Sequence, residues 1–229
     1  MFDNTPVLGR SESALEATNK VLRNTYALLG LTMIPTVIGA FIGMSLNFAF
    51  AQQHPIIFAV GALAVMYGLF AAIAANRNSS VGVVLLLGLT FLMGLMLGPI
   101  LQLALHLSNG AQIVGLAAAG TGIILFSLAS FAAASKKDFS FMSKFLLIGI
   151  ILLIVASLAN IFLQIPAMTL ALSGVGVILF SGFILYDVSR IVNGGETNYI
   201  MATLSLYVSI YNLFTSLLQL LMGLMGSDD

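Results

Sequence analysis

Long uncharged apolar stretches alternate with short polar stretches along most of the chain. Each apolar stretch has about 20 residues or more, enough for an α-helix to cross the ~30 Å hydrocarbon core of a bilayer. The connections are rich in Gly, Pro, Asn and Ser, which end helices and form turns. The pattern predicts an all-α, polytopic membrane protein. Its seven predicted transmembrane spans are 26–50, 55–75, 81–105, 111–134, 145–164, 167–188 and 199–225.

The two ends of the chain are polar and lie outside these spans. Residues 1–24 form a polar leader, which we expect to be cytoplasmic and disordered, and residues 226–229 form a short extracytoplasmic tail. The connections between spans are too short to hold a soluble domain. Residues 25–225 are therefore predicted to form one membrane domain.

Composition supports the membrane interpretation. Hydrophobic residues make up 60% of the chain and charged residues only 7%, whereas a soluble domain carries about 25% charged residues. The net charge is zero, which argues against nucleic acid as a partner because binding to phosphates needs many basic residues. The chain has no cysteine, so disulfides and thiolate metal sites are excluded.

The basic residues indicate the orientation in the membrane. An excess of Lys and Arg marks the cytoplasmic loops of a multi-span protein. With seven spans, every Lys and Arg falls on the side of the N-terminus, which predicts a cytoplasmic N-terminus and an extracytoplasmic C-terminus. These residues are Arg10, Lys20, Arg23, Arg77, Lys136, Lys137, Lys144 and Arg190.

Polar side chains form one stripe along the seventh predicted span. A stripe this polar is unfavourable in lipid, so the span is predicted to lie near the centre of the bundle. The stripe can serve as the wall of an ion path, or it can hold helices together through hydrogen bonds worth about 0.6 kcal/mol each. At helical spacings of 4, 3, 4 and 3, the stripe consists of Ser205, Ser209, Asn212, Ser216 and Gln219.

Asp187 is the only acidic residue within a predicted span. It lies near the cytoplasmic end of 167–188, with Arg190 three residues further along the same helix face. Arg77 ends the second span at the same membrane level. Asp187 can therefore form a structural ion pair at the interface, or it can act as a cation ligand or gate latch.

Small residues and prolines within the spans indicate packing rather than chemistry. Gly39 and Gly43, like Gly94 and Gly98, have the four-residue spacing that lets helices approach closely. Prolines at 35 and 99 predict kinks in the first and third spans.

Neither a metal site nor a catalytic site is expected. His54 and His106 fall in loops on the extracytoplasmic side without acids nearby, so no metal or other cofactor is predicted. Asp187 follows Tyr186, as in one half of a presenilin-type aspartyl pair, but the span 199–225 has no acid to complete it. The sequence does not predict an enzyme.

Motifs throughout the chain resemble those of the Bax inhibitor-1 family, also called the transmembrane Bax-inhibitor-motif family. Segments 20–26 and 194–200 look specifically like its bacterial YccA-like branch. The family motifs lie at 97–101, 136–141, 159–162, 184–187, 205–207 and 212–214.

The resemblance implies a bundle of seven helices with the seventh at its centre, and it implies two activities. Some members of the family are pH-sensitive calcium leaks, gated by aspartates on the sixth and seventh helices with an arginine latch from the second. YccA-like members are substrates and modulators of FtsH, the ATP-dependent protease of the bacterial inner membrane. The expected partners are therefore the lipid bilayer, an FtsH-like protease, and Ca²⁺ or protons.

One position departs from the calcium-leak pattern. Asp187 matches the first aspartate and Arg77 lies close to the latch position, but the second aspartate is replaced by Ser209. Two neighbouring carboxylates titrate in coupled steps and so sense pH, whereas a lone carboxylate beside an arginine is expected to stay ionised. Ser209 also brings no charge to a Ca²⁺ site. Modulation of the protease is therefore the first prediction, and a calcium or cation leak the second.

Overall fold

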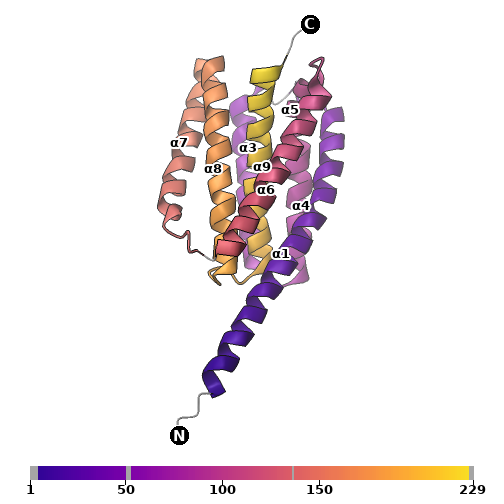
Figure 1. The fold of residues 1–229 in the computed structure, drawn as a ribbon. Helices are drawn as coiled ribbons and strands as arrows, with labels where there is room; N and C mark the ends of the chain where they lie inside the picture. The colour runs from indigo at the N-terminus through magenta and orange to yellow at the C-terminus, as the bar shows by residue number, and fades with distance from the viewer. Residues whose placement is uncertain (1–4, 50–52, 136, 227–229) are drawn as a thin grey trace.

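The structure is a computed structural model that describes residues 5–49, 53–135 and 137–226. All the regular elements in these ranges are helices, which confirms the all-α prediction (Figure 1). The helices are α1 (Thr5–Ser45), α3 (Pro55–Ala75), α4 (Ser80–Met96), α5 (Gly98–Leu105), α6 (Gly110–Ser135), α7 (Met142–Leu163), α8 (Pro166–Val192) and α9 (Tyr199–Met225).

The helices account for the predicted seven transmembrane spans. In the described part of the chain, seven helical segments are long and apolar enough to cross a membrane, with α4 and α5 together forming one of them. Large apolar side chains such as Phe126, Phe145 and Ile178 are exposed on the outside of the bundle, where lipid can cover them. The number of spans is confirmed.

Helix α9 lies at the centre of the bundle, as predicted. It contacts α1, α3, α4, α6 and α8, and Leu206, Tyr207 and Leu213 on it are fully buried. The Tyr207 hydroxyl lies 2.8 Å from Thr36 Oγ1 of α1 and donates a hydrogen bond to the main-chain oxygen of Thr90 in α4 at 3.3 Å. These hydrogen bonds connect three spans near the middle of the membrane.

The leader is continuous with the first helix of the bundle. Its residues from Thr5 onward are helical and continue directly into the first span, so α1 projects from the bundle (Figure 1). Residues 1–4 lie outside the described ranges. A polar segment attached to a stable helix need not pay the cost of nucleation, and this one contains good helix formers such as Ala, Leu and Glu.

Pro35 and Pro99 have different effects on the helices that contain them. The third span breaks at Leu97, between α4 and α5, because Pro99 has no N–H to continue the helical ladder. This confirms the predicted distortion at Pro99. Helix α1 continues as one helix on both sides of Pro35.

The small-residue pairs form the contact between α1 and α4–α5. A Cβ atom on Gly39 would meet the Phe91 main-chain oxygen, and one on Gly94 would meet the Thr36 main-chain oxygen. A Cβ atom on Gly98 would meet the main chain of Gly43, and one on Gly43 would meet the main chain of Leu95. The prediction that these glycines permit close helix packing is confirmed.

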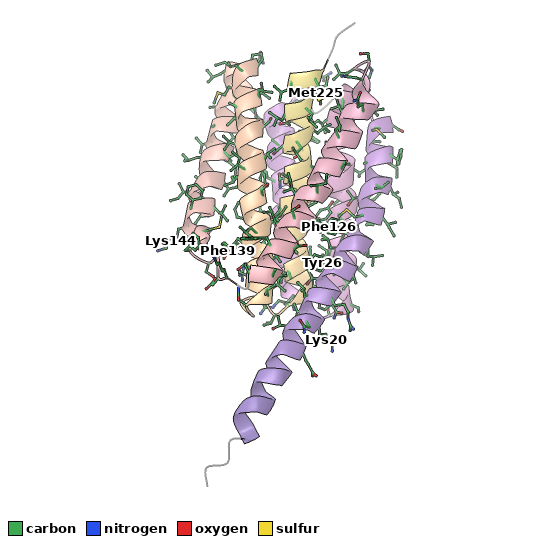
Figure 2. The ribbon with its side chains drawn as sticks, viewed as in Figure 1. Lys20, Tyr26, Phe126, Phe139, Lys144 and Met225 are labelled. Carbon is green, nitrogen blue, oxygen red and sulfur yellow. The ribbon has the colours of Figure 1, made fainter. Side chains whose placement is uncertain are left out.

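The loops that carry basic residues lie together at one end of the bundle, which we call the basic end; Lys20 and Lys144 mark it in Figure 2, and Met225 marks the opposite end. Asn198 Nδ2, at the start of α9, donates to Arg77 O and Asn78 Oδ1 in the α3–α4 turn, both at 2.9 Å. Hydrogen bonds therefore tie the loops of the basic end to one another.

Candidate functional site

Asp187 lies in α8, near the basic end, and faces α9. Its side chain is buried, with only 9% of the residue surface exposed. Ser209 Oγ of α9 donates a hydrogen bond to Asp187 Oδ2 at 3.2 Å. The structure therefore brings together the two residues that the sequence places at the paired-acid positions. An acid buried within a membrane span marks a candidate site for handling protons or cations.

Arg190 interacts with a different acid from the one expected. Its Nη2 lies 3.6 Å from Glu196 Oε2 and donates to Gly195 O at 3.3 Å. Its guanidinium also lies 5.6 Å from the centre of the Tyr186 ring. The chain turns back after α8 at Gly194, which has a φ of 73°, and this turn brings Glu196 to Arg190.

The ion pair that the sequence allows as one of two alternatives for Asp187 is not formed with either arginine. Within the described residues, neither Arg190 nor Arg77 makes a salt bridge with Asp187. Arg77 lies in the α3–α4 turn with its side chain exposed, and its main-chain oxygen is held by Asn198. The sequence placed these groups at the same membrane level, but the distance between them depends on how the helices pack.

The α6–α7 loop is hydrogen-bonded to α8 close to Asp187. Ser189 Oγ donates to Lys137 O at 2.9 Å and accepts from Phe139 N at 3.1 Å. Within the loop, the Ser140 hydroxyl and amide both donate to Asp138, which holds the pKa of that exposed carboxyl below its usual value. Asp138 thus stays ionised at neutral pH and stabilises the turn at Ser140 within the loop.

The polar stripe of α9 faces α8 over several turns. Ser173 Oγ of α8 donates to Gln219 Oε1 at 3.0 Å. A Cβ atom on Gly176 would come within 2.5 Å of Ser216 Oγ, so α8 has no side chain at that contact. Asn212 instead donates to Val208 O of its own helix, at 2.8 Å. Hydrogen bonds to α8 therefore explain the polar side chains at Ser209 and Gln219.

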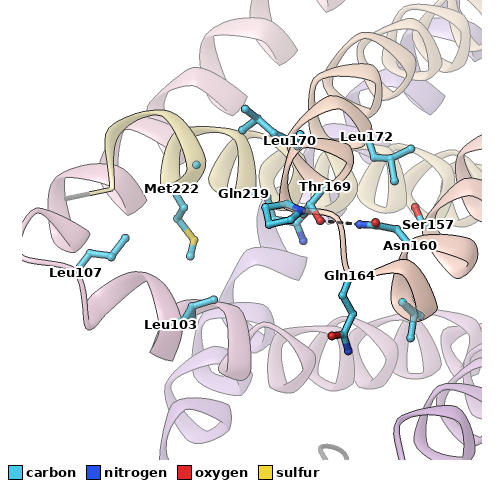
Figure 3. A pocket seen from close by; sticks show the side chains of 14 residues that line it. Leu103, Leu107, Ser157, Asn160, Gln164, Thr169, Leu170, Leu172, Gln219 and Met222 are labelled. Carbon is cyan, nitrogen blue, oxygen red and sulfur yellow. Dashed lines mark hydrogen bonds between the residues drawn. The ribbon is translucent and has the colours of Figure 1, made fainter. Parts of the chain in front are cut away.

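Two adjoining cavities lie between α7, α8 and α9, in the half of the bundle opposite the basic end. The larger, about 920 Å³, also touches α5 and is shown in Figure 3. The smaller, about 330 Å³, extends towards the middle of the bundle. They share Ser157, Ile161, Leu172 and Gln219. We call the two together the lateral groove.

Sequence reasoning missed the lateral groove. The available signal was the spacing of Ser157, Asn160 and Gln164, which repeats at three and four residues on the otherwise apolar helix α7 and just beyond it. Asn160 Nδ2 donates to Thr169 Oγ1 of α8 at 2.7 Å (Figure 3).

Within the described residues, no cluster of three or more His, Asp or Glu side chains is placed to hold a metal ion.

These features define a polytopic α-helical membrane protein with a buried acid on its sixth span and a polar, central seventh span. A family model described as "Inhibitor of apoptosis-promoting Bax1" matches residues 18–227. The chain belongs to this family, the Bax inhibitor-1 family.

Curated relatives cover nearly the whole chain. An uncharacterized membrane protein of Vibrio cholerae is 45% identical over 229 residues, covering 99% of this chain and 100% of the relative. The Escherichia coli K12 protein named "Modulator of FtsH protease YccA" is 39% identical over 209 residues, covering 91% of this chain and 92% of the relative. A protein from a second Escherichia coli strain, with the same identity and coverage, is named "Inner membrane protein YccA". The chain is thus similar to a bacterial multi-span inner-membrane protein.

Proposed function

We propose that this protein is a non-catalytic modulator that binds an FtsH-like, membrane-anchored ATP-dependent protease and slows its digestion of other membrane substrates. The observation that carries the proposal is the 39% identity, over 91% of the chain, to the relative named as a modulator of that protease. The match extends through the entire helical bundle rather than one motif, so it favours a function shared by the whole domain.

The fold suggests how a substrate of the protease can also inhibit it. Helix α1 projects from the basic end and offers a segment that an unfolding enzyme can engage (Figure 1). The bundle resists extraction, because removing α1 separates the glycine contact with α4–α5 and the Thr36–Tyr207 hydrogen bond. Main-chain groups exposed during extraction also find no hydrogen-bond partners in lipid. A substrate that is engaged but slowly extracted occupies the enzyme.

The proposal predicts physical association and slower turnover of a second substrate. The protein is expected to co-purify with, or crosslink to, the protease in native membranes. Raising its expression is expected to slow the degradation of another membrane substrate of the same protease. A multi-span protein of similar size, expressed at the same level, is the control for crowding. Absence of association, together with an unchanged degradation rate, would reject the proposal.

The proposal requires the basic end to face the cytoplasm, where such an enzyme works. A reporter active only outside the cytoplasm is expected to function when fused after Asp229 or between His106 and Gly110. The same reporter is expected to be silent near Lys137 or Asn193. The reason is the placement of all Lys and Arg residues on the side of the N-terminus. Activity at Asn193 would contradict this orientation.

The hydrogen bond between Asp187 and Ser209 favours a second candidate function, a weak cation leak. Ser209→Asp would place two carboxylates in contact, and such a pair titrates in coupled steps. In liposomes containing the purified protein, Ser209→Asp is expected to make calcium flux more steeply pH-dependent than in the wild type, because the added carboxylate couples its titration to that of Asp187. A steep pH-dependent leak in the wild type, abolished by Asp187→Asn, would rank the leak above protease modulation.

A further inference from the structure

The length of the lateral groove is about half the thickness of the hydrocarbon core of a membrane. Along α9 it runs from Asn212 to Gly223, which at 1.5 Å per residue is about 17 Å. The hydrocarbon core is ~30 Å thick, so each leaflet contributes ~15 Å. The groove therefore matches the acyl region of one leaflet, on the side opposite the basic end.

The groove closes towards the basic end because α7 packs tightly on α8 there. A Cβ atom on Gly149 of α7 would meet Leu179 Cδ1 at 2.6 Å, and one on Gly182 of α8 would meet Leu146 Cδ2 at 2.9 Å. Leu146 is also the buried residue of α7. A transmembrane helix from a partner, or from a second copy of this chain, would need a groove through both leaflets and would meet this closure.

The lining combines apolar walls with uncharged hydrogen-bonding groups. Leu103, Leu107 and Met222 point into the open space, and Gln164 extends into it from the α7–α8 connection (Figure 3). Gln219, Asn160 and Thr169 add further amide and hydroxyl groups. None of the described residues that line the groove is charged, and the basic residues of the chain are associated with the other end.

We propose that the lateral groove binds a diacyl phospholipid with a zwitterionic headgroup, taken from the leaflet opposite the basic end. Its length suits an acyl chain, and about 920 Å³ lies at the upper end of the ~300–1,000 Å³ typical of ligand sites. Amide and hydroxyl groups hydrogen-bond to ester and phosphate oxygens. The site has no cation to favour a headgroup with net negative charge.

Photolabelling in liposomes tests this site. The probes are phosphatidylethanolamine and phosphatidylglycerol with the same diazirine-bearing acyl chain, each incorporated at low mole fraction with the full-length protein. Peptides from α7, α8 and α9 that line the groove are expected to carry most of the phosphatidylethanolamine label. The phosphatidylglycerol probe is expected to label them severalfold less.

Two exposed alanines of α8 provide a matched pair of variants. Ala167 lines the groove and Ala171, one turn further along, does not. Ala167→Phe is expected to reduce groove labelling severalfold, while Ala171→Phe leaves it unchanged. Label spread evenly over the seven spans, equal labelling by the two lipids, or equal loss in the two variants would overturn the proposal. A protein captured by a photoreactive amino acid at Ala167 in native membranes would also overturn it.

Discussion

Gly94→Ala is expected to destabilise the bundle by about 1–3 kcal/mol or more, the cost of adding a methyl group where close packing leaves no space. The new Cβ atom would meet the main chain of Thr36 in α1. Main-chain atoms cannot rotate away as a flexible side chain can, so the two helices must separate. The same displacement strains the hydrogen bond between Thr36 and Tyr207, which links α1 to the central helix.

Gly88→Ala is the matched control, because Gly88 lies in the same helix but a Cβ atom there meets nothing within 4 Å. An alanine in a helix interior is about 0.5–1 kcal/mol more favourable than glycine, so this variant is expected to equal or exceed the wild type in stability. Thermal unfolding of the purified proteins in one detergent measures both changes. Equal midpoints for the two variants would show that the glycine contact does not limit the stability of the bundle.

Features that depend on short stretches of sequence were predictable. Hydrophobicity over about 20 residues is sufficient to locate a span in a bilayer, and the seven spans are confirmed. The spacing of Ser209 and Gln219 placed both on one face of α9, and the structure gives each a hydrogen-bond partner on α8. The glycine pairs were predictable for the same reason, since their four-residue spacing puts both members on one helix face.

Features that depend on the distance between helices were not predictable. Arg190 is close to Asp187 in sequence, yet the turn at Gly194 brings Glu196 to it instead. The hydrogen bonds of Tyr207 and the lateral groove each require three or more helices to be placed relative to one another. A single amino-acid sequence does not directly indicate the distances between helices that are far apart along the chain.

Deleting residues 2–18 is expected to lengthen the lifetime of this protein severalfold in cells that contain the membrane protease. An ATP-dependent enzyme needs an accessible segment to begin pulling, and the projecting part of α1 is the longest segment outside the bundle in the described structure (Figure 1). Lys20 and Arg23 remain in the shortened chain and maintain the orientation. The contacts that Thr36 of α1 makes with α4 and α9 lie beyond the deletion and stay intact. Pulse-chase measurement of the full-length and shortened proteins, with the protease present and depleted, determines the effect.

Removal of residues 227–229, at the other end of the chain, is the control and is expected to leave the lifetime unchanged. If the shortened protein is degraded as fast as the full-length one, the enzyme does not engage the N-terminal end of α1.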